Sequence, residues 1–130
     1  DGDTVVLFKG ANIVHMGDHF FNGFYPFVDV DSGGRVRGVA KNVTKLLTMI
    51  NDETLIVPGH GPMASKNDLI AFRDMLLGTA SEVEALMASK SLEEIQSLGL
   101  SAQWDEWEDG FLNEKTWIKI VFDSFETGAV

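Results

Sequence analysis

Two short segments hold the side chains of this sequence that are best suited to chemistry. Asp18 follows the β-branched apolar run 13–16, and His60 follows a second such run, 54–57, within the sequence PGHGP. Sites in α/β folds commonly lie just past the carboxyl ends of strands. Because the chain contains no cysteine, any metal would be held by imidazole and carboxylate groups. If the two strands are parallel or close neighbours, we expect Asp18 and His60 to meet at one edge of a sheet.

Each segment taken alone is weak evidence for a site. A Gly-Asp pair after a strand is usually a plain turn, and a histidine between glycines is usually a solvated turn residue. Around His60, however, Gly59 and Gly61 leave room for a ligand, and Pro58 and Pro62 stiffen the turn. The occurrence of both segments after successive strands favours a functional interpretation.

The apolar pattern predicts α/β elements that would position these segments. Residues 4–8 and 13–16 are typical of a β-hairpin. The stretch 17–34, rich in aromatic residues, glycine and aspartate, is expected to be a long loop, which in a compact domain is often functional. Apolar residues spaced i, i+3, i+4 and i+7 predict an amphipathic helix over 35–50.

The second strand, 54–57, is expected to stop at Pro58, and helices should follow it. Serine with an acidic residue three positions later predicts a capping box at the start of a long helix over 65–89, and another at Ser91 for a short helix. Asn113 is a candidate cap for a last helix. The order strand, helix, strand indicates an α/β fold.

The composition limits the partners of the chain. Its 130 residues, 45% of them hydrophobic, are enough for one domain with a core. The net charge of −10 repels phosphate backbones and anionic lipid, so we expect neither nucleic acid nor membrane as a partner. No apolar run approaches the ~18–20 residues of a membrane span.

The order and spacing of these segments resemble those of one known family. IVHMGDHFF followed by LIVPGHGP, with YPFVDVDSGG and the amphipathic helix between them, is similar to the second half of a metallo-β-lactamase superfamily domain. The resemblance covers nearly the whole chain. It implies an α/β fold that is half of an αββα sandwich, a mixed β-sheet flanked by helices. Residues 1–130 would then form a single partial domain, the C-terminal half of that fold.

The resemblance also implies a metal-dependent hydrolase that most often uses one or two zinc ions. Asp18 matches the family's metal-bridging aspartate, and His60 matches its last histidine ligand. Zinc lowers the pKa of bound water to about 7, which supplies a nucleophile at neutral pH. The implied reaction is hydrolysis of an ester, amide, thioester or related bond in a small-molecule substrate.

The sequence departs from the family pattern in its metal ligands. The His-x-His-x-Asp-His motif is absent, and the family's middle histidine would fall just before Asp1. Two ligands do not define a tetrahedral zinc site, so we expect this chain alone to bind zinc weakly or not at all and to be inactive. Its start at Asp1 is expected to reflect truncation or processing of a longer parent. An exposed half-core is expected to make the isolated chain self-associate.

Weaker candidates for the edge of a substrate site are His19, Phe21, Tyr25, Ser32 and Gly33. The aromatic residues of this stretch either line an apolar groove or pack beneath the loop as satellite core, and the sequence leaves both open. The Ser-Gly-Gly segment offers backbone N–H groups to an anion. His15 is expected to be a hydrogen-bonded structural residue.

Two other functions are compatible with the same residues. The first is a non-catalytic, metal-free interaction or scaffold module that keeps the fold and two vestigial ligands. The second is a redox protein of the flavo-di-iron type, which shares the fold and ligands. Zinc content, iron content and the presence of upstream ligands distinguish the three.

Overall fold

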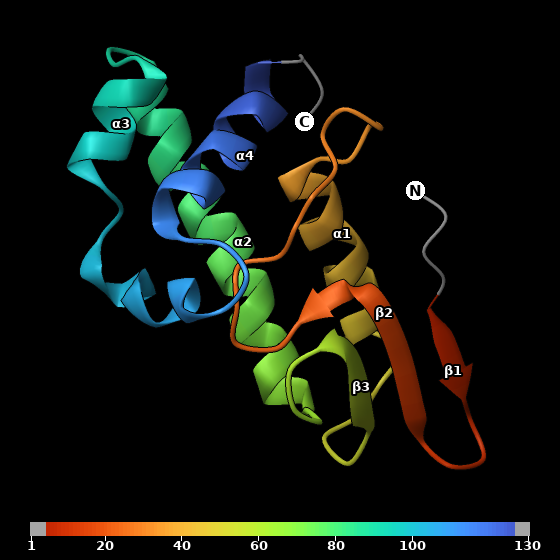
Figure 1. The fold of residues 1–130 in the computed structure, drawn as a ribbon. Coiled ribbons are helices and arrows are strands. Elements are labelled where there is room, and N and C mark those ends of the chain that lie inside the picture. The colour runs from red at the N-terminus through yellow and green to blue at the C-terminus, as the bar shows by residue number, and fades with distance from the viewer. Residues whose placement is uncertain (1–4, 127–130) are drawn as a thin grey trace.

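The computed structural model describes residues 5–126, in which three strands are followed mainly by helices (Figure 1). Residues 1–4, which include part of the first predicted strand, lie outside the described residues. The elements are β1 (Val6–Phe8), β2 (Ile13–Phe21), α1 (Val36–Leu47), β3 (Leu55–His60), α2 (Lys66–Met87), α3 (Leu92–Leu98), the 3₁₀ helix η1 (Ala102–Asp109) and α4 (Glu114–Glu126). We call α2, α3, η1 and α4 the helical layer.

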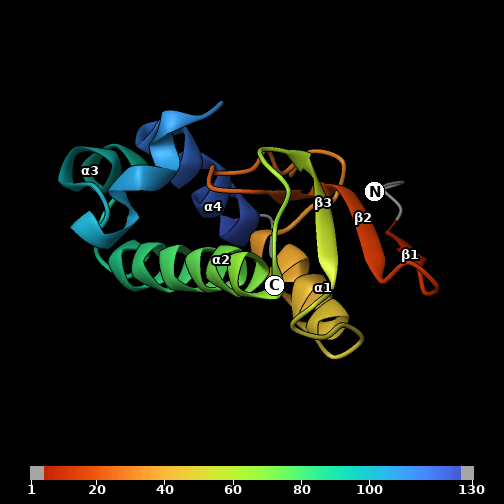
Figure 2. The ribbon, with the colours of Figure 1, turned by 90° about the horizontal axis from the view of Figure 1, so that it is seen from below.

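The strands form one mixed sheet in the order β1-β2-β3. Strand β1 is antiparallel to β2, whereas β2 and β3 are parallel and connected through α1. Figure 2 shows α1 on one side of the sheet and α2 beside it. The hairpin, the amphipathic helix and the second strand are therefore confirmed.

Two predicted strand ends are wrong. Strand β2 does not stop at Met16 but continues to Phe21, because Gly17 (φ 54°) forms an irregularity within the strand instead of a turn after it. Strand β3 likewise continues past Pro58 to His60. Pro58 lacks an N–H group, and it pairs with Gly17 where the register of the ladder already shifts, so little regular pairing is lost.

The two faces of the sheet differ in their surroundings. Leu7, Val14 and Ile56 share the face that packs into the core. Strand alternation places the neighbours of these residues on the opposite face. We call this opposite face the outer sheet face, and it consists of Val6, Phe8, Ile13, His15, Leu55 and Val57. It is mostly apolar and partly open, since Phe8 is 53% exposed and Leu55 is 40% exposed.

The predicted helix starts are confirmed by their hydrogen bonds. Reciprocal capping boxes join Ser65 to Asp68 and Ser91 to Glu94. The side chain of Asn113 accepts a hydrogen bond of 2.9 Å from the backbone N–H of Thr116 in the first turn of α4. Side chains therefore satisfy backbone N–H groups at the starts of α2, α3 and α4, which helix geometry would otherwise leave unpaired.

The largest side chains of the chain pack in the helical layer and against it. Trp117 of α4 is fully buried, stacks on Tyr25 at 5.2 Å and donates a hydrogen bond of 3.0 Å to Thr79 Oγ1 of α2. The η1 helix docks on α2 through Trp104, whose Nε1 donates to Glu82 at 2.6 Å. Burial comes first among the causes that raise the pKa of the Tyr25 hydroxyl, which is therefore neutral at pH 7.

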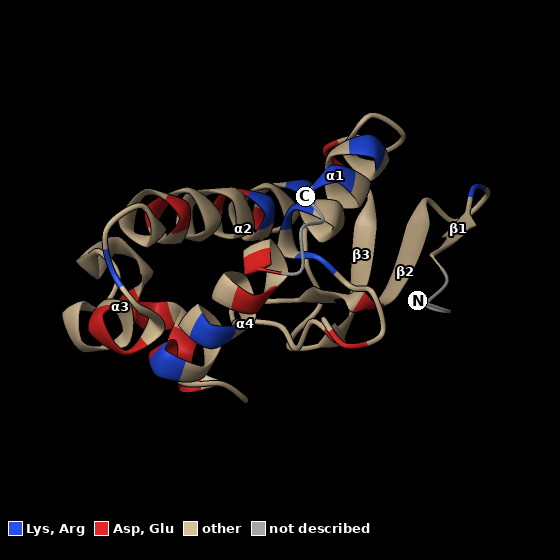
Figure 3. Ribbon diagram, turned by 90° about the horizontal axis from the view of Figure 1, so that it is seen from above, with Lys and Arg blue, Asp and Glu red and all other residues tan. Residues whose placement is uncertain are grey.

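Charge is unevenly distributed over the helices. Helix α1 contains Arg37, Lys41 and Lys45 and no acidic residue, whereas acidic residues gather on the helical layer (Figure 3). Within residues 5–126, none of the helices has the length and apolar character of a membrane span.

Candidate functional site

The C-terminal half of β2 and the carboxyl end of β3 bring Asp18 and His60 together. The carboxylate Oδ1 of Asp18 lies 3.3 Å from Nε2 of His60, and both side chains are partly exposed, at 57% and 39%. The parallel pairing of the two strands causes this convergence, because equivalent ends of parallel strands lie at one edge of the sheet. We call Gly17–Asp18 and Gly59–His60 the strand tips.

Glycine at position 59 allows the strand tips to approach each other. A Cβ atom on Gly59 would lie 2.5 Å from the carbonyl oxygen of Gly17 and 2.8 Å from Oδ1 of Asp18. Gly61 adopts a positive φ of 98°, and a Cβ there would lie 2.6 Å from the carbonyl oxygen of Asn22. No L side chain fits at either position without a shift of the backbone, so both glycines are required by the geometry of the site.

Asn22 ties the turn of His60 to the end of β2. Its backbone N–H donates to the carbonyl oxygen of His60 at 2.9 Å, and its side-chain Nδ2 donates to the carbonyl oxygen of Pro62 at 2.9 Å. Sequence reasoning missed Asn22, because an asparagine after an aromatic pair carries no signal of a partner forty residues away. The two bonds fix the backbone on both sides of His60.

Aromatic rings flank the His60 imidazole. The buried ring of Phe21 stacks on it at 4.6 Å, and Phe111 contacts it edge-on at 4.8 Å. Phe111 belongs to the connection between η1 and α4 and is 62% exposed. Nothing near it in the sequence could have predicted a position beside His60, which results from the packing of the helical layer against the sheet.

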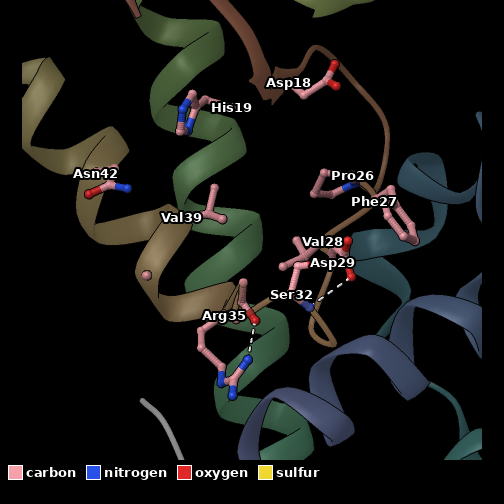
Figure 4. A pocket seen from close by; sticks show the side chains of 13 residues that line it. Asp18, His19, Pro26, Phe27, Val28, Asp29, Ser32, Arg35, Val39 and Asn42 are labelled. Carbon is pink, nitrogen blue, oxygen red and sulfur yellow. Dashed lines mark hydrogen bonds between the residues drawn. The ribbon is translucent and has the colours of Figure 1, made fainter. Parts of the chain in front are cut away.

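A hollow of about 580 Å³ opens beside Asp18. We call it the loop pocket, because the segment 26–35 forms one wall and α1 forms the other (Figure 4). Among the weaker candidates, His19, Ser32 and Gly33 line this pocket. Phe21 and Tyr25 do not: Phe21 packs on His60, and Tyr25 is fully buried with its hydroxyl donating to the carbonyl oxygen of Trp104 at 3.2 Å.

The aromatic stretch divides between core and pocket. Phe20 is fully buried and packs on Phe72 of α2, and Tyr25 joins it in the core. Phe27 is instead 61% exposed and lines the loop pocket. Satellite core is therefore the larger role of this stretch, and one aromatic ring serves the pocket.

Hydrogen bonds within the loop hold the pocket wall in place. Oδ1 of Asp29 accepts from the backbone N–H of Ser32 at 3.2 Å. Nη1 of Arg35 donates to the carbonyl oxygens of Val30 at 3.0 Å and Gly34 at 2.7 Å. The side chains of Asp29 and Arg35 thus stabilise the backbone of the loop.

His15 lies away from the site, on the outer sheet face. Its Nδ1 accepts a hydrogen bond of 3.2 Å from the backbone N–H of Gly17. This bond supports the irregular conformation of β2 at Gly17 and agrees with the structural role expected for His15.

The Asp18–His60 pair fits part of a metal site. Two ligands on one tetrahedral zinc, at bond lengths of 2.0–2.2 Å, are separated by about 3.3–3.6 Å, and the two donor atoms here are 3.3 Å apart. Within residues 5–126, however, no group of three or more His, Cys, Asp or Glu side chains is placed to hold a metal. The described residues therefore supply two donors and not a complete site.

Comparison with known proteins supports the fold. No protein-family model and no curated protein sequence matches the chain. Among solved structures, it is similar to a double mutant of the sec-alkyl sulfatase PisA1, with a TM-score of 0.67 and 15% identity over 95% of this chain. The chain has a metallo-β-lactamase-like fold. It spans only 23% of the sulfatase, so the likeness confirms the fold class and not the activity.

Proposed function

We propose that this chain is the C-terminal part of a metal-dependent hydrolase of the metallo-β-lactamase superfamily, with Asp18 and His60 as two ligands of its metal, most simply zinc. The observation that carries the proposal is the 3.3 Å approach of Oδ1 of Asp18 to Nε2 of His60 on two adjacent parallel strands. The similarity of the fold to that of an alkyl sulfatase supports a hydrolase.

The surrounding residues have roles consistent with this proposal. Gly59 permits the close approach of the two donors, and Asn22 fixes the backbone of His60. Stacking on Phe21 orients the imidazole ring. Such outer contacts orient metal ligands in known sites. When bound, zinc polarises the scissile group and lowers the pKa of water, while the remaining ligands would come from the rest of the fold.

Zinc titration of the chain, followed by NMR, tests the proposal. We expect zinc to shift the signals of Asp18 and His60 selectively and with weak affinity, since two donors make an incomplete site. Asp18→Asn and His60→Gln should each weaken binding at least about tenfold, because each removes one of two donors. His15→Asn is the matched control, since this histidine lies on the outer sheet face and an asparagine Oδ1 can still accept the hydrogen bond from the backbone N–H of Gly17, and it should bind zinc like the wild type.

Two outcomes would overturn the assignment. Zinc that leaves the signals of Asp18 and His60 unmoved, or variants that bind as tightly as the wild type, would favour the metal-free interaction module instead. In a longer protein that contains the remaining ligands, Asp18→Asn and His60→Gln should both abolish hydrolysis. Unchanged turnover in both would contradict the proposal.

We also propose that residues 1–130 form a partial domain, whose outer sheet face is covered by a second copy when the chain is alone. This face presents Val6, Phe8 and Leu55 to solvent, next to the open edge of β1. Apolar sheet faces and unpaired strand edges favour association. We expect light scattering at micromolar concentration to give a mass above one chain.

A charge on the outer sheet face should break this association. Phe8→Lys places an ammonium group on the apolar face at the edge strand β1, so the mass should fall toward one chain. Phe27→Lys is the matched control, because Phe27 is similarly exposed, at 61%, but lies in the loop pocket. A single-chain mass for the wild type would refute self-association.

A further inference from the structure

We propose that the loop pocket binds the uncharged, largely apolar body of the substrate, and that Gly38 of α1 keeps the pocket open for it. The pocket begins at Asp18 and runs between the loop and α1, with a volume of about 580 Å³ (Figure 4). This volume lies within the range of small-molecule sites. That the reacting group of the substrate lies at Asp18 rests on the proposed function.

The first observation is that packing does not explain the glycine at position 38. Two other glycines of the pocket wall are required by the backbone: Gly33 has a φ of 99°, and a Cβ on Gly34 would lie 2.8 Å from the carbonyl oxygen of Asp29. A Cβ on Gly38 would meet only Cβ of Arg35, at an ordinary 3.7 Å. Glycine is also the least favourable residue within a helix after proline. A side chain would fit at this position, and the space that it would fill belongs to the pocket.

The face of α1 that lines the pocket indicates the chemistry of the ligand. Gly38, Val39 and Asn42 of α1 line it at helical spacing. The basic residues of α1, Arg37, Lys41 and Lys45, are absent from the pocket lining. Arg37 is instead paired with Glu84 at 2.9 Å. Helix α1 thus presents the amide of Asn42, the side chain of Val39 and the backbone of Gly38 to the pocket.

The opposite wall combines apolar side chains with two charged side chains that are bonded to the loop backbone. Pro26, Phe27 and Val28 supply apolar surface, and Phe27 is largely exposed. The charged groups of the wall, Asp29 and Arg35, are hydrogen-bonded to the backbone of the loop. Apart from Asp18 and His19 at the β2 end of the pocket, the charged side chains of the lining are held by the loop backbone, and an apolar body would bury surface against both walls. The hydroxyl of Ser32 and the amide of Asn42 remain to orient an uncharged polar group.

Binding of three eight-carbon probes that differ only in head charge tests this proposal. The probes are 1-octanol, octyl sulfate and octyltrimethylammonium, each kept below its micelle or solubility limit and titrated into the full chain. The readout is the NMR amide signals of Gly33 and Gly34, which line the pocket and lie far in sequence from the outer sheet face. We expect 1-octanol to shift these signals in a saturable way and to bind more tightly than either charged probe.

Variants at position 38 supply the decisive comparison. Gly38→Leu should fill the pocket and weaken octanol binding at least tenfold, and Gly38→Ala should have an intermediate effect. Thr44→Leu, at an exposed position of α1 outside the pocket, is the matched control and should bind like the wild type. Equal binding by Gly38→Leu and the wild type, no saturable shift at Gly33 and Gly34, or tighter binding of a charged probe would each overturn the proposal. None of these readouts depends on zinc, so a failed metal site and a failed pocket remain distinguishable.

Discussion

At the strand tips, two backbone segments approach each other until no Cβ atom fits between them, whereas in the helical layer the largest side chains fill the space between elements. A Cβ on Gly59 would lie 2.5 Å from the carbonyl oxygen of Gly17, yet Asp18 and His60 remain partly exposed. Trp117, by contrast, is fully buried between Tyr25 and Thr79. The difference indicates that the helical layer supplies stability, while the tips place polar groups where a ligand can reach them.

The largest effect on stability is expected from Trp117→Ala in the helical layer. The change removes a fully buried ring and leaves Thr79 Oγ1 without its indole donor. Truncation of a buried aromatic residue lowers the free energy of unfolding by about 3–5 kcal/mol. Urea denaturation followed by circular dichroism measures it. Trp117→Phe keeps a ring against Tyr25 and should recover most of the loss; a loss below about 1 kcal/mol for Trp117→Ala would contradict the comparison.

A smaller loss of stability, with a larger loss of site geometry, is expected from Gly59→Ala. The new methyl group would overlap the carbonyl of Gly17 and crowd Asp18, so the strand tips must separate. Overpacking of this kind lowers the free energy of unfolding by about 1–3 kcal/mol. The separation itself is measured as changed NMR signals of Asp18 and His60 and as weaker zinc binding.

Gly10→Ala is the matched control for this substitution. Gly10 lies in the hairpin turn before β2, and a Cβ there would meet no atom within 4 Å. It should change stability by less than about 0.5 kcal/mol and leave the signals of Asp18 and His60 unchanged. If Gly59→Ala behaves like Gly10→Ala, the close approach of the strand tips is not a requirement of the site.

The accuracy of the sequence-based predictions differs between features set by the local sequence and features set by tertiary contacts. Capping residues such as Ser65, Ser91 and Asn113 act within one turn of helix, and their roles were predicted correctly. The meeting of Asp18 and His60 was expected because a general rule of parallel sheets places strand ends together. Whether Gly17 turns the chain or bulges within a strand depends on β3, which pairs with it, so the end of β2 was predicted wrongly.

The neighbours of the candidate ligands were beyond sequence reasoning. Phe111 contacts His60 because the connection between η1 and α4 lies beside Phe21 and His60, and η1 itself has no periodic apolar pattern from which it could be predicted. Tyr25 and Phe27 are two residues apart in one aromatic stretch, yet one is fully buried and the other is 61% exposed. Composition cannot distinguish such neighbours, because the burial of Tyr25 depends on Trp117, which is distant in sequence.

A pH-dependent effect of intermediate size is expected from Glu82→Gln in the helical layer. Burial raises the pKa of Glu82, but hydrogen bonds from the Ser101 backbone and from the side chains of Trp104 and Ser101 outweigh it and lower the pKa below its usual value. A lowered folded-state pKa stabilises the protein above the unfolded-state pKa, and this contribution is lost as the pH falls through the folded-state value.

The substitution should therefore lower the free energy of unfolding by about 1 kcal/mol at pH 7, and the difference should shrink below about pH 4. Urea denaturation at several pH values measures it. Glu106→Gln, an exposed carboxyl of η1, is the control and should change stability by less than about 0.5 kcal/mol. A difference that grows toward acid pH would mean that the anchoring of η1 on Glu82 is not electrostatic.

The smallest effect on stability is expected from Asp18→Asn at the strand tips. The Asp18–His60 pair is partly exposed, and even a fully charged pair at an exposed position contributes only about 0–1 kcal/mol to stability. Thermal and urea denaturation should therefore give nearly wild-type values, while zinc no longer shifts the signals of His60. That combination would separate the two regions most sharply, because it removes the proposed chemistry without disturbing the fold. A loss of stability as large as that of Gly59→Ala would instead mean that the Asp18–His60 pair is a structural contact. A side chain whose role is to bind a ligand can be replaced without loss of the fold that holds it.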